Sequence, residues 1–138
     1  MIVLDTNVVS EAFRPDAAAR VKAWFASQAA QDLFVCAPVM AELRYGIEKM
    51  AQGARRADFL NRYAAIRDQF RNRILAFNLR AAETFAEIVV AREQTGAPIA
   101  PLDAQIAAIA RSQGATLATR NLKDFAGCGV TLVDPWAE

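Results

Sequence analysis

Five short apolar segments alternate along the chain with segments of helical periodicity, and this alternation restricts the fold more than any other feature. The apolar segments show no regular polar positions, as expected for parallel strands that are buried on both faces. Strands and helices that alternate in this way predict an α/β fold, in which helices cover both faces of a central parallel sheet. The predicted strands are residues 1–5, 33–37, 74–77, 116–119 and 130–133.

The predicted helices lie between these strands, and prolines and glycines mark several of their ends. Pro38 and Pro101 stand where a helix can begin without losing a hydrogen bond. Gly53 is expected as a left-handed cap of the helix before it, and the helices on either side of it should form a hairpin. The helical patterns cover about 21–30, 38–50, a stretch with Phe59, Tyr63, Ile66 and Phe70 on one face, 79–95, and 101–113.

The length and composition suit one domain over residues 1–138. Of the 138 residues 54% are hydrophobic, which is enough to bury a core without disulfides. No apolar stretch approaches the roughly 18 residues of a membrane span, and the amino terminus lacks the features of a signal peptide. We therefore expect a cytoplasmic protein with no membrane association. The two cysteines, Cys36 and Cys128, are isolated, and we assign them no chemistry.

The chain contains no histidine, and this excludes several classes of active site. Serine–histidine and cysteine–histidine hydrolases, histidine-ligated zinc and the histidine pair of pancreatic-type ribonucleases all require that side chain. The net charge of +1 argues against a protein that coats nucleic acid. However, thirteen of the sixteen cationic residues are arginines, whose planar guanidinium suits phosphate, so a local basic face is compatible with the sequence.

Acidic and amide side chains occur where the predicted strands end. Asp5 ends the first strand, Glu42 lies one turn into the helix after the second, and Asp103 lies near the start of the helix before the fourth. The segment after the fourth strand contains Asn121 and Asp124. Because ligands of parallel sheets bind beyond the carboxyl ends of the strands, we expect these four segments to converge at one edge.

A cluster of carboxylates is unfavourable unless a cation neutralises it, since like charges raise one another's pKa. Mg²⁺, or alternatively Mn²⁺, suits oxygen ligands without histidine or thiolate, and it can activate water beside a phosphodiester. Asp5 and Asp103 are the predicted direct ligands. Glu42, together with Asp124 or Asn121, would hold the waters of the ion or a second ion.

Each of these residues also has a purely structural interpretation. Asp5 could cap a turn or a helix, and Asp103 could complement the positive end of its helix. Glu42 could be a solvated surface residue, and Asp124 could form an exposed ion pair with Arg120. The predicted metal site therefore depends on the convergence of the four segments.

Four strings of the sequence resemble motifs of PIN-domain proteins, in the order and spacing of that family. The resemblance is closest to the VapC and FitB-like branch and covers essentially the whole chain, including the ending VDPW at residues 133–136. The strings are IVLDTN at 2–7, AELRYG at 41–46, PLDAQIA at 101–107 and ATRNLKDF at 118–125.

The resemblance implies an α/β/α sandwich and an endoribonuclease that depends on Mg²⁺ or Mn²⁺, with Asp5, Glu42 and Asp103 as its three acids. It also implies the toxin of a toxin–antitoxin pair. The expected partners are an RNA substrate and a cognate antitoxin that inserts an arginine-bearing or otherwise blocking segment. The expected assemblies are a homodimer and a toxin–antitoxin hetero-oligomer. Operator DNA is expected to be bound only through the antitoxin.

One position departs from the pattern of the family, because its fourth acid, often an aspartate, is Asn121 here. Asp124 could substitute for it, or three acids could suffice. The departure leaves open an alternative function, a catalytically weak or inactive binding or regulatory module that acts with an antitoxin-like DNA-binding partner. A phosphatase of the haloacid dehalogenase type is disfavoured, since Asn7 stands where that chemistry needs a second acid.

Overall fold

A five-stranded parallel sheet forms the centre of the computed structural model, which describes residues 1–137. The strand order is β3-β2-β1-β4-β5, and every neighbouring pair is parallel. All five predicted strands are present, each slightly shorter than predicted. They are β1 (Ile2–Leu4), β2 (Leu33–Cys36), β3 (Ile74–Leu75), β4 (Thr116–Ala118) and β5 (Thr131–Val133).

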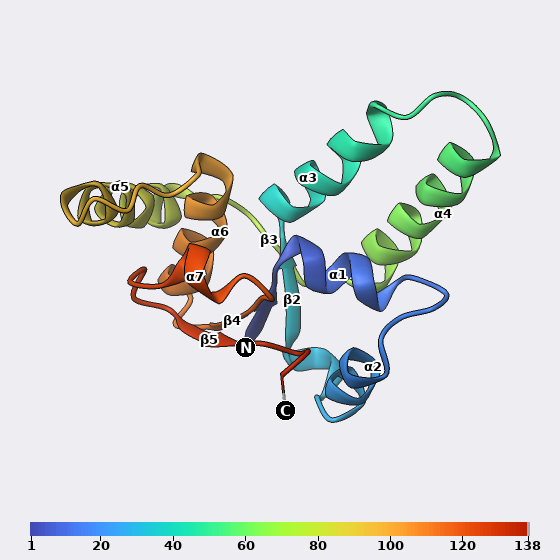
Figure 1. The fold of residues 1–138 in the computed structure, drawn as a ribbon, viewed down its shortest axis with the longest axis horizontal. Helices are drawn as coiled ribbons and strands as arrows, with labels where there is room; N and C mark the ends of the chain where they lie inside the picture. The colour runs from blue at the N-terminus through green and yellow to red at the C-terminus, as the bar shows by residue number, and fades with distance from the viewer. Residues whose placement is uncertain (138) are drawn as a thin grey trace.

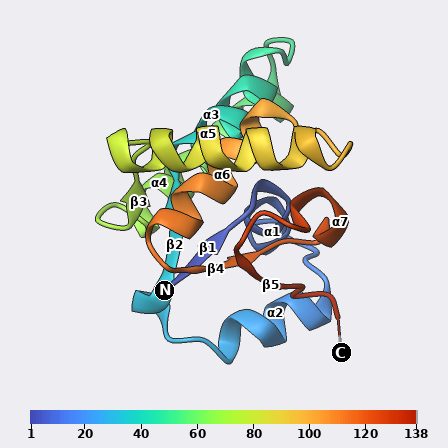
Figure 2. The same ribbon diagram turned by 90° about the vertical axis from the view of Figure 1, so that its left-hand side faces the viewer.

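Helices lie on both sides of the sheet, which confirms the predicted three-layer α/β/α sandwich (Figure 1). Helices α1, α2 and α4 lie on one side of β1 and β2, whereas α5, α6 and α7 lie on the other. In the turned view, α5 crosses in front of α6, against which it packs (Figure 2). The bounds are α1 (Thr6–Ala12), α2 (Ala19–Ala26), α3 (Ala37–Glu48), α4 (Ala54–Gln69), α5 (Leu79–Gln94), α6 (Pro101–Ser112) and α7 (Leu122–Phe125).

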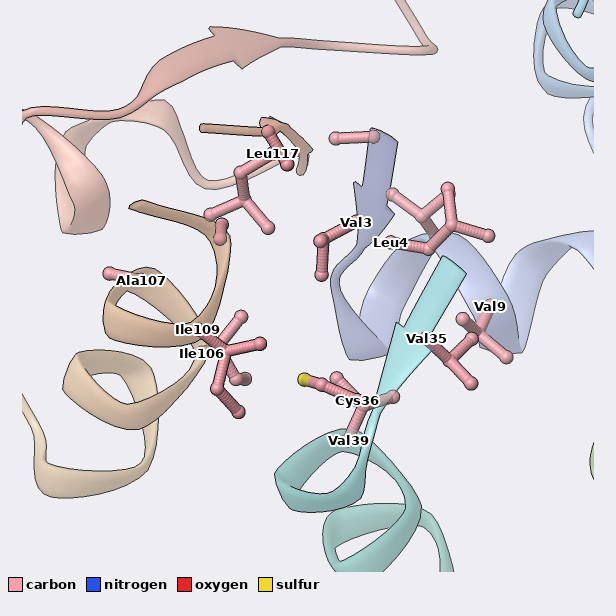
Figure 3. Close-up of a cluster of buried hydrophobic side chains, with 14 of the residues drawn as sticks. Val3, Leu4, Val9, Val35, Cys36, Val39, Ile106, Ala107, Ile109 and Leu117 are labelled. Carbon is pink, nitrogen blue, oxygen red and sulfur yellow. The ribbon is translucent and has the colours of Figure 1, made fainter. Parts of the chain in front are cut away.

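The core lies where the central strands meet the helices that cover them (Figure 3). Val3 and Leu4 of β1 and Leu117 of β4 have no exposed surface, and Ile106 of α6 is equally buried. Burying one such side chain contributes about 1.5–3 kcal/mol. The apolar runs in the sequence therefore become strands because both of their faces are covered.

The chain's connections diverge at β1, which pairs with β2 on one side and with β4 on the other. Such a divergence opens a crevice at the carboxyl edge of a parallel sheet. Leu4 is level with Ala118, so the residues that follow them, Asp5 and Thr119, stand side by side at this edge. The topology thus brings two distant parts of the sequence together.

Three short elements were absent from the sequence prediction. Residues 6–12 form the helix α1, residues 122–125 form α7, and Ala30–Asp32 form the 3-10 turn η1. A helix of four to seven residues spans at most two turns, too few for a hydrophobic period to show. The prediction of a helix from 21 to 30 was wrong at both ends, because α2 covers Ala19–Ala26.

The predicted role of Gly53 was also wrong. Helix α3 ends at Glu48 with Lys49 as its C-cap, and Gly53 instead precedes α4 as its N-cap with a φ of 146°. Its carbonyl accepts the N–H of Ala57, so the glycine starts the second helix of the hairpin. No helix within residues 1–137 is long and apolar enough to span a membrane. Glu138, the last residue of the predicted domain 1–138, lies outside the described residues.

Candidate metal centre

Asp5 stands at the junction of β1 and α1, where it is the N-cap of the helix. Its Oδ1 accepts the N–H of Thr6 at 2.8 Å, and its Oδ2 accepts the hydroxyl of Thr119 at 2.7 Å. Its backbone N–H donates to the carbonyl of Ala118 at 2.9 Å. The carboxylate is therefore held in one orientation. The structural interpretation of Asp5 as a helix cap is also confirmed, because Asp5 caps α1.

The carboxylate of Asp5 is buried, with 4% of the residue exposed. Burial raises its pKa above the ordinary value, although the hydrogen bonds from Thr119 and Thr6 act in the opposite direction. The charges of Glu42 and Asp124 raise the pKa further. A carboxylate that is oriented and short of solvation in this way would be stabilised in its charged form by a nearby cation.

Glu42 lies on α3 and is exposed. Its Oε1 accepts a hydrogen bond from the hydroxyl of Thr6, the first residue of α1. Because Thr6 follows Asp5 directly, this hydrogen bond fixes Glu42 beside the end of β1. The structure therefore brings Glu42 to the edge where the sequence placed it.

Asp103 is the third residue of α6 and is partly buried. Its pKa is raised to about 6, first of all by this burial. The negative charges of Asp5, Asp124 and Glu42 raise it further, whereas the positive charge of Arg92 lowers it. Burial and the three neighbouring acids thus all favour the protonated form of Asp103 in the absence of a cation.

Asp124 and Asn121 lie on the segment that follows β4, and both are exposed. The charge of Asp124 acts on Asp5 and on Asp103, so this carboxylate belongs to the same edge. Asn121 occupies the N-cap of α7, but its side chain caps nothing. Its backbone N–H donates to Oγ1 of Thr119 at 3.0 Å, which links the turn to the hydroxyl that holds Asp5.

The four acids share one edge but do not form a closed ligand set. Within residues 1–137, no three acidic or cysteine side chains are close enough together to hold a metal ion directly. Their chemistry nevertheless fits a hard divalent cation, since all four donors are carboxylates and Mg²⁺ retains several waters in its coordination shell. The residues suit an ion bound by one or two carboxylates and partly through water.

Three residues that support this edge were not identified from the sequence. Thr6 and Thr119 stand within the sequence motifs but were given no role, and Arg92 stands outside them. Thr6 donates to Glu42, and Thr119 donates to Asp5. The positive charge of Arg92 lowers the pKa of Asp103. Thr119 and Arg92 are both buried, yet a lone threonine or arginine carries no signal of that in the sequence.

The two arginines next to the motif acids do not neutralise them. Arg44 pairs with Glu48 at 2.7 Å, one turn along α3. Arg120 lies over the ring of Trp136, with 4.9 Å between its Cζ and the ring centre. No ion pair between Arg120 and Asp124 occurs in the described part of the chain, so the ion-pair interpretation of Asp124 was wrong.

Comparisons with known proteins agree with this architecture. The PIN-domain profile matches residues 2–127. VapC ribonuclease Y4jK of Sinorhizobium fredii is 36% identical over 137 residues, which covers 99% of this chain and 98% of that protein. Toxin FitB of Neisseria gonorrhoeae is also 36% identical, with 99% of each chain covered. The structure of FitAB bound to an IR36 DNA fragment has a TM-score of 0.92 at 35% identity and covers 100% of this chain and 97% of that one. The resemblance inferred from the motifs is confirmed, and the chain belongs to the PIN-domain family.

Proposed function

We propose that this protein is a metal-dependent endoribonuclease and the toxin of a toxin–antitoxin pair. The observation that carries the proposal is that Asp5, Glu42, Asp103 and Asp124 gather at the carboxyl edge of the sheet. There, the charges of the neighbouring acids raise the pKa values of Asp5 and Asp103. Within residues 1–137, none of these four carboxylates forms an ion pair with an arginine or a lysine, which makes a bound cation the natural neutralising group. The names of the relatives, a VapC ribonuclease and the toxin FitB, support the same activity and the same role. The cytoplasm, where RNA is present, is the proposed place of action.

In this proposal, Asp5 and Asp103 bind Mg²⁺ or Mn²⁺ directly, and Glu42 and Asp124 orient bound waters. Asp5 is suited to a direct contact because its hydrogen bonds leave a free lone pair on each oxygen. The ion would supply a nucleophilic water and neutralise negative charge on the scissile phosphate. Asn121 can offer its amide oxygen where the family often has an aspartate, at the cost of one negative charge.

Cleavage of RNA tests this function. Purified protein, freed of any bound partner, is incubated with a labelled mixed RNA pool in Mg²⁺, in Mn²⁺ and in EDTA. We expect cleavage that stops in EDTA and in Asp103→Asn. The control is Asp58→Asn, which removes an exposed carboxylate paired with Arg62 and should cut normally. Cleavage that persists in EDTA, or equal activity of Asp103→Asn, would overturn the proposal.

A groove next to the acids suits the proposed antitoxin. It lies between α1, α3 and α4 and has a volume of about 710 Å³. Thr6 and Glu42 stand among its lining residues, so a bound segment would reach the acidic edge. Most of the other lining side chains are apolar or cationic: Phe13, Leu43, Ile47, Met50, Phe59, Tyr63 and Ile66, and Arg14, Arg55 and Arg62. Asp16, which pairs with Arg14, also lines the groove, together with Ser10, Pro15 and Gly46. We assign the groove to an amphipathic antitoxin segment, whose own arginine could pair with Glu42.

The proposed assemblies have separate support. Leu79 and Val90 are 76% and 50% exposed, and their spacing of eleven residues places them on one face of α5, where a second copy could cover them. The FitAB complex is described as bound to a DNA fragment, which supports operator binding by a toxin–antitoxin complex. In this protein we propose that the antitoxin makes the DNA contacts, because the net charge of the toxin is only +1.

The second candidate function is a binding or regulatory module that cuts nothing. It is favoured by Asn121 at the fourth acidic position and by the absence of a closed three-acid set within residues 1–137. The RNA experiment separates the two functions when it is combined with antitoxin binding. A folded, monodisperse protein that binds the antitoxin but neither binds metal nor cuts RNA would establish the module.

A further inference from the structure

Arg92 is a buried cation that the proposed chemistry does not use. It lies near the end of α5 and is 9% exposed. No carboxylate lies within ion-pair distance of it in residues 1–137. Burying an arginine costs free energy unless its N–H groups are satisfied, so its hydrogen bonds define its role.

The guanidinium of Arg92 joins two segments that are far apart in the sequence. Its Nε donates to the carbonyl of Ala97 at 2.6 Å, in the loop before α6. Its Nη1 donates to the carbonyls of Asp124 at 2.8 Å and Ala126 at 3.1 Å, and it lies 3.5 Å from the sulfur of Cys128. One of these segments leads into the helix that carries Asp103, and the other carries Asp124.

We propose that Arg92 is a positioning residue of the acidic edge, whose guanidinium holds residues 121–128 against the entrance of α6 so that Asp124 stays beside Asp5 and Asp103. The part that concerns metal binding depends on the proposed function. The part that concerns the conformation of residues 121–128 does not.

The short length of α7 explains why residues 121–128 need the hydrogen bonds from Arg92. A helix of four residues has little stability of its own. The segment that contains α7 follows the three-residue strand β4, which ends at Ala118. The carbonyls at the end of α7 accept two long backbone hydrogen bonds, from the Ala126 N–H to Lys123 at 3.4 Å and from the Cys128 N–H to Phe125 at 3.3 Å. Arg92 donates to two further carbonyls of this segment, those of Asp124 and Ala126. The guanidinium of an arginine carries its N–H donors on three separate nitrogens, so it can reach all three carbonyls. The donors of a lysine all lie on one nitrogen, which cannot reach the same set.

The test compares Arg92→Lys with Arg73→Lys. Arg73 is a matched control, because its guanidinium also donates to three backbone carbonyls, those of Ala30 at 2.7 Å, Gln69 at 2.8 Å and Leu33. These carbonyls belong to η1, to the end of α4 and to the first residue of β2, at the opposite edge of the sheet from the four acids. Two readouts are measured for each variant: amide hydrogen exchange of residues 121–128 in EDTA, and Mn²⁺ binding by calorimetry.

We expect Arg92→Lys to speed amide exchange at 121–128 about tenfold or more, as the loss of a charge-assisted hydrogen bond requires. Mn²⁺ affinity should fall by about tenfold, the usual effect of removing a residue that orients metal ligands. Arg73→Lys should change neither readout, even if it melts at a lower temperature. Unchanged exchange at 121–128 in Arg92→Lys would overturn the proposal.

The two readouts also separate this proposal from the proposed function. If wild-type protein binds no Mn²⁺, the metal site fails, but the exchange of residues 121–128 still decides whether Arg92 holds them. If wild-type protein binds Mn²⁺ and Arg92→Lys binds it equally well despite faster exchange, Arg92 is a structural residue only. Should Arg92→Lys not fold, Arg92→Gln at lower temperature, which retains one side-chain donor group, provides the same comparison.

Discussion

The hydroxyl of Thr119 donates a 2.7 Å hydrogen bond to Oδ2 of Asp5, which links the ends of two neighbouring parallel strands. The same Oγ1 accepts the backbone N–H of Asn121 at 3.0 Å. One buried hydroxyl thus fixes both a carboxylate of the acidic edge and the turn that follows β4. The orientation of Asp5 depends on a residue 114 positions away in the sequence.

Replacing Thr119 by valine tests this relationship. Thr119→Val keeps the shape of the side chain but leaves a buried oxygen of Asp5 without its donor, which should reduce the free energy of unfolding by about 1–3 kcal/mol. The pKa of Asp5 should rise further, because a hydrogen bond to its charged form is lost. Urea denaturation measures the loss. Thr119→Ser retains the hydroxyl and should restore most of the stability; equal losses in both variants would show that packing, rather than the hydrogen bond, is responsible.

The raised pKa of Asp103, about 6, makes the stability of metal-free protein depend on pH. The folded state binds this proton more tightly than the unfolded chain, whose aspartates titrate near 3.9. The contribution is therefore fully present below about pH 4 and is lost as the pH rises through about 6. Melting temperatures measured in EDTA across this range should fall with rising pH in the wild type.

Asp103→Asn provides the control for that measurement. The amide cannot ionise, so its variant should show a shallower fall and should be more stable than the wild type near pH 7 in EDTA. Asp5 also has a raised pKa, and part of the fall should therefore remain. An Asp103→Asn protein with the same pH profile as the wild type would show that the shift lies on another group.

The groove between α1, α3 and α4 has open space beside Gly46. Gly46 lies on α3 among the lining residues, and a Cβ placed there would meet no atom within 4 Å. Gly46→Trp should therefore fold and still cut RNA, but it should bind the antitoxin more weakly in a titration. Gly46→Ala should bind normally and gain up to about 1 kcal/mol of helix stability. Undiminished binding by Gly46→Trp would place the antitoxin elsewhere.

Cys36 is a packing residue rather than a nucleophile. It has no exposed surface, and burial raises the pKa of its thiol to about 12. Iodoacetamide should therefore leave it unmodified in folded protein and react with it after denaturation. Cys36→Ala should lower the free energy of unfolding by about 1–2 kcal/mol without changing RNA cleavage. Cys128→Ser should likewise leave the chemistry unchanged; inactivation of a folded Cys128→Ser protein would reveal a functional thiol.

The sheet and its five main helices could be predicted because buried parallel strands and long amphipathic helices leave strong patterns in a sequence. Val3, Leu4, Val35 and Leu117 lie in uninterrupted apolar runs, and all four are fully buried. The helices α1 and α7 could not be predicted in this way. The contacts that accompany them are non-repeating: Asp5 caps α1, and Arg92 donates to carbonyls in and after α7.

The positions of the acids were predictable for a different reason. Once the strands are parallel, Asp5 and the residues after Ala118 must share an edge, and Glu42 and Asp103 follow from the adjoining helices. The polar residues that hold them could not be found, because their partners are remote. Thr119 donates a hydrogen bond to Asp5, and Arg92 donates one to the carbonyl of Asp124, in both cases more than thirty residues away. No local spacing in the sequence indicates such contacts.

The most direct test of the metal-site proposal is Mn²⁺ binding to purified, antitoxin-free protein, measured by calorimetry for the wild type and for Asp5→Asn. The amide keeps the size of the side chain and can still accept hydrogen bonds from Thr6 or Thr119, but it removes the buried negative charge. The proposal predicts saturable binding by the wild type and loss of that binding in a folded Asp5→Asn protein. Equal binding by both proteins, or none by the wild type, would contradict it.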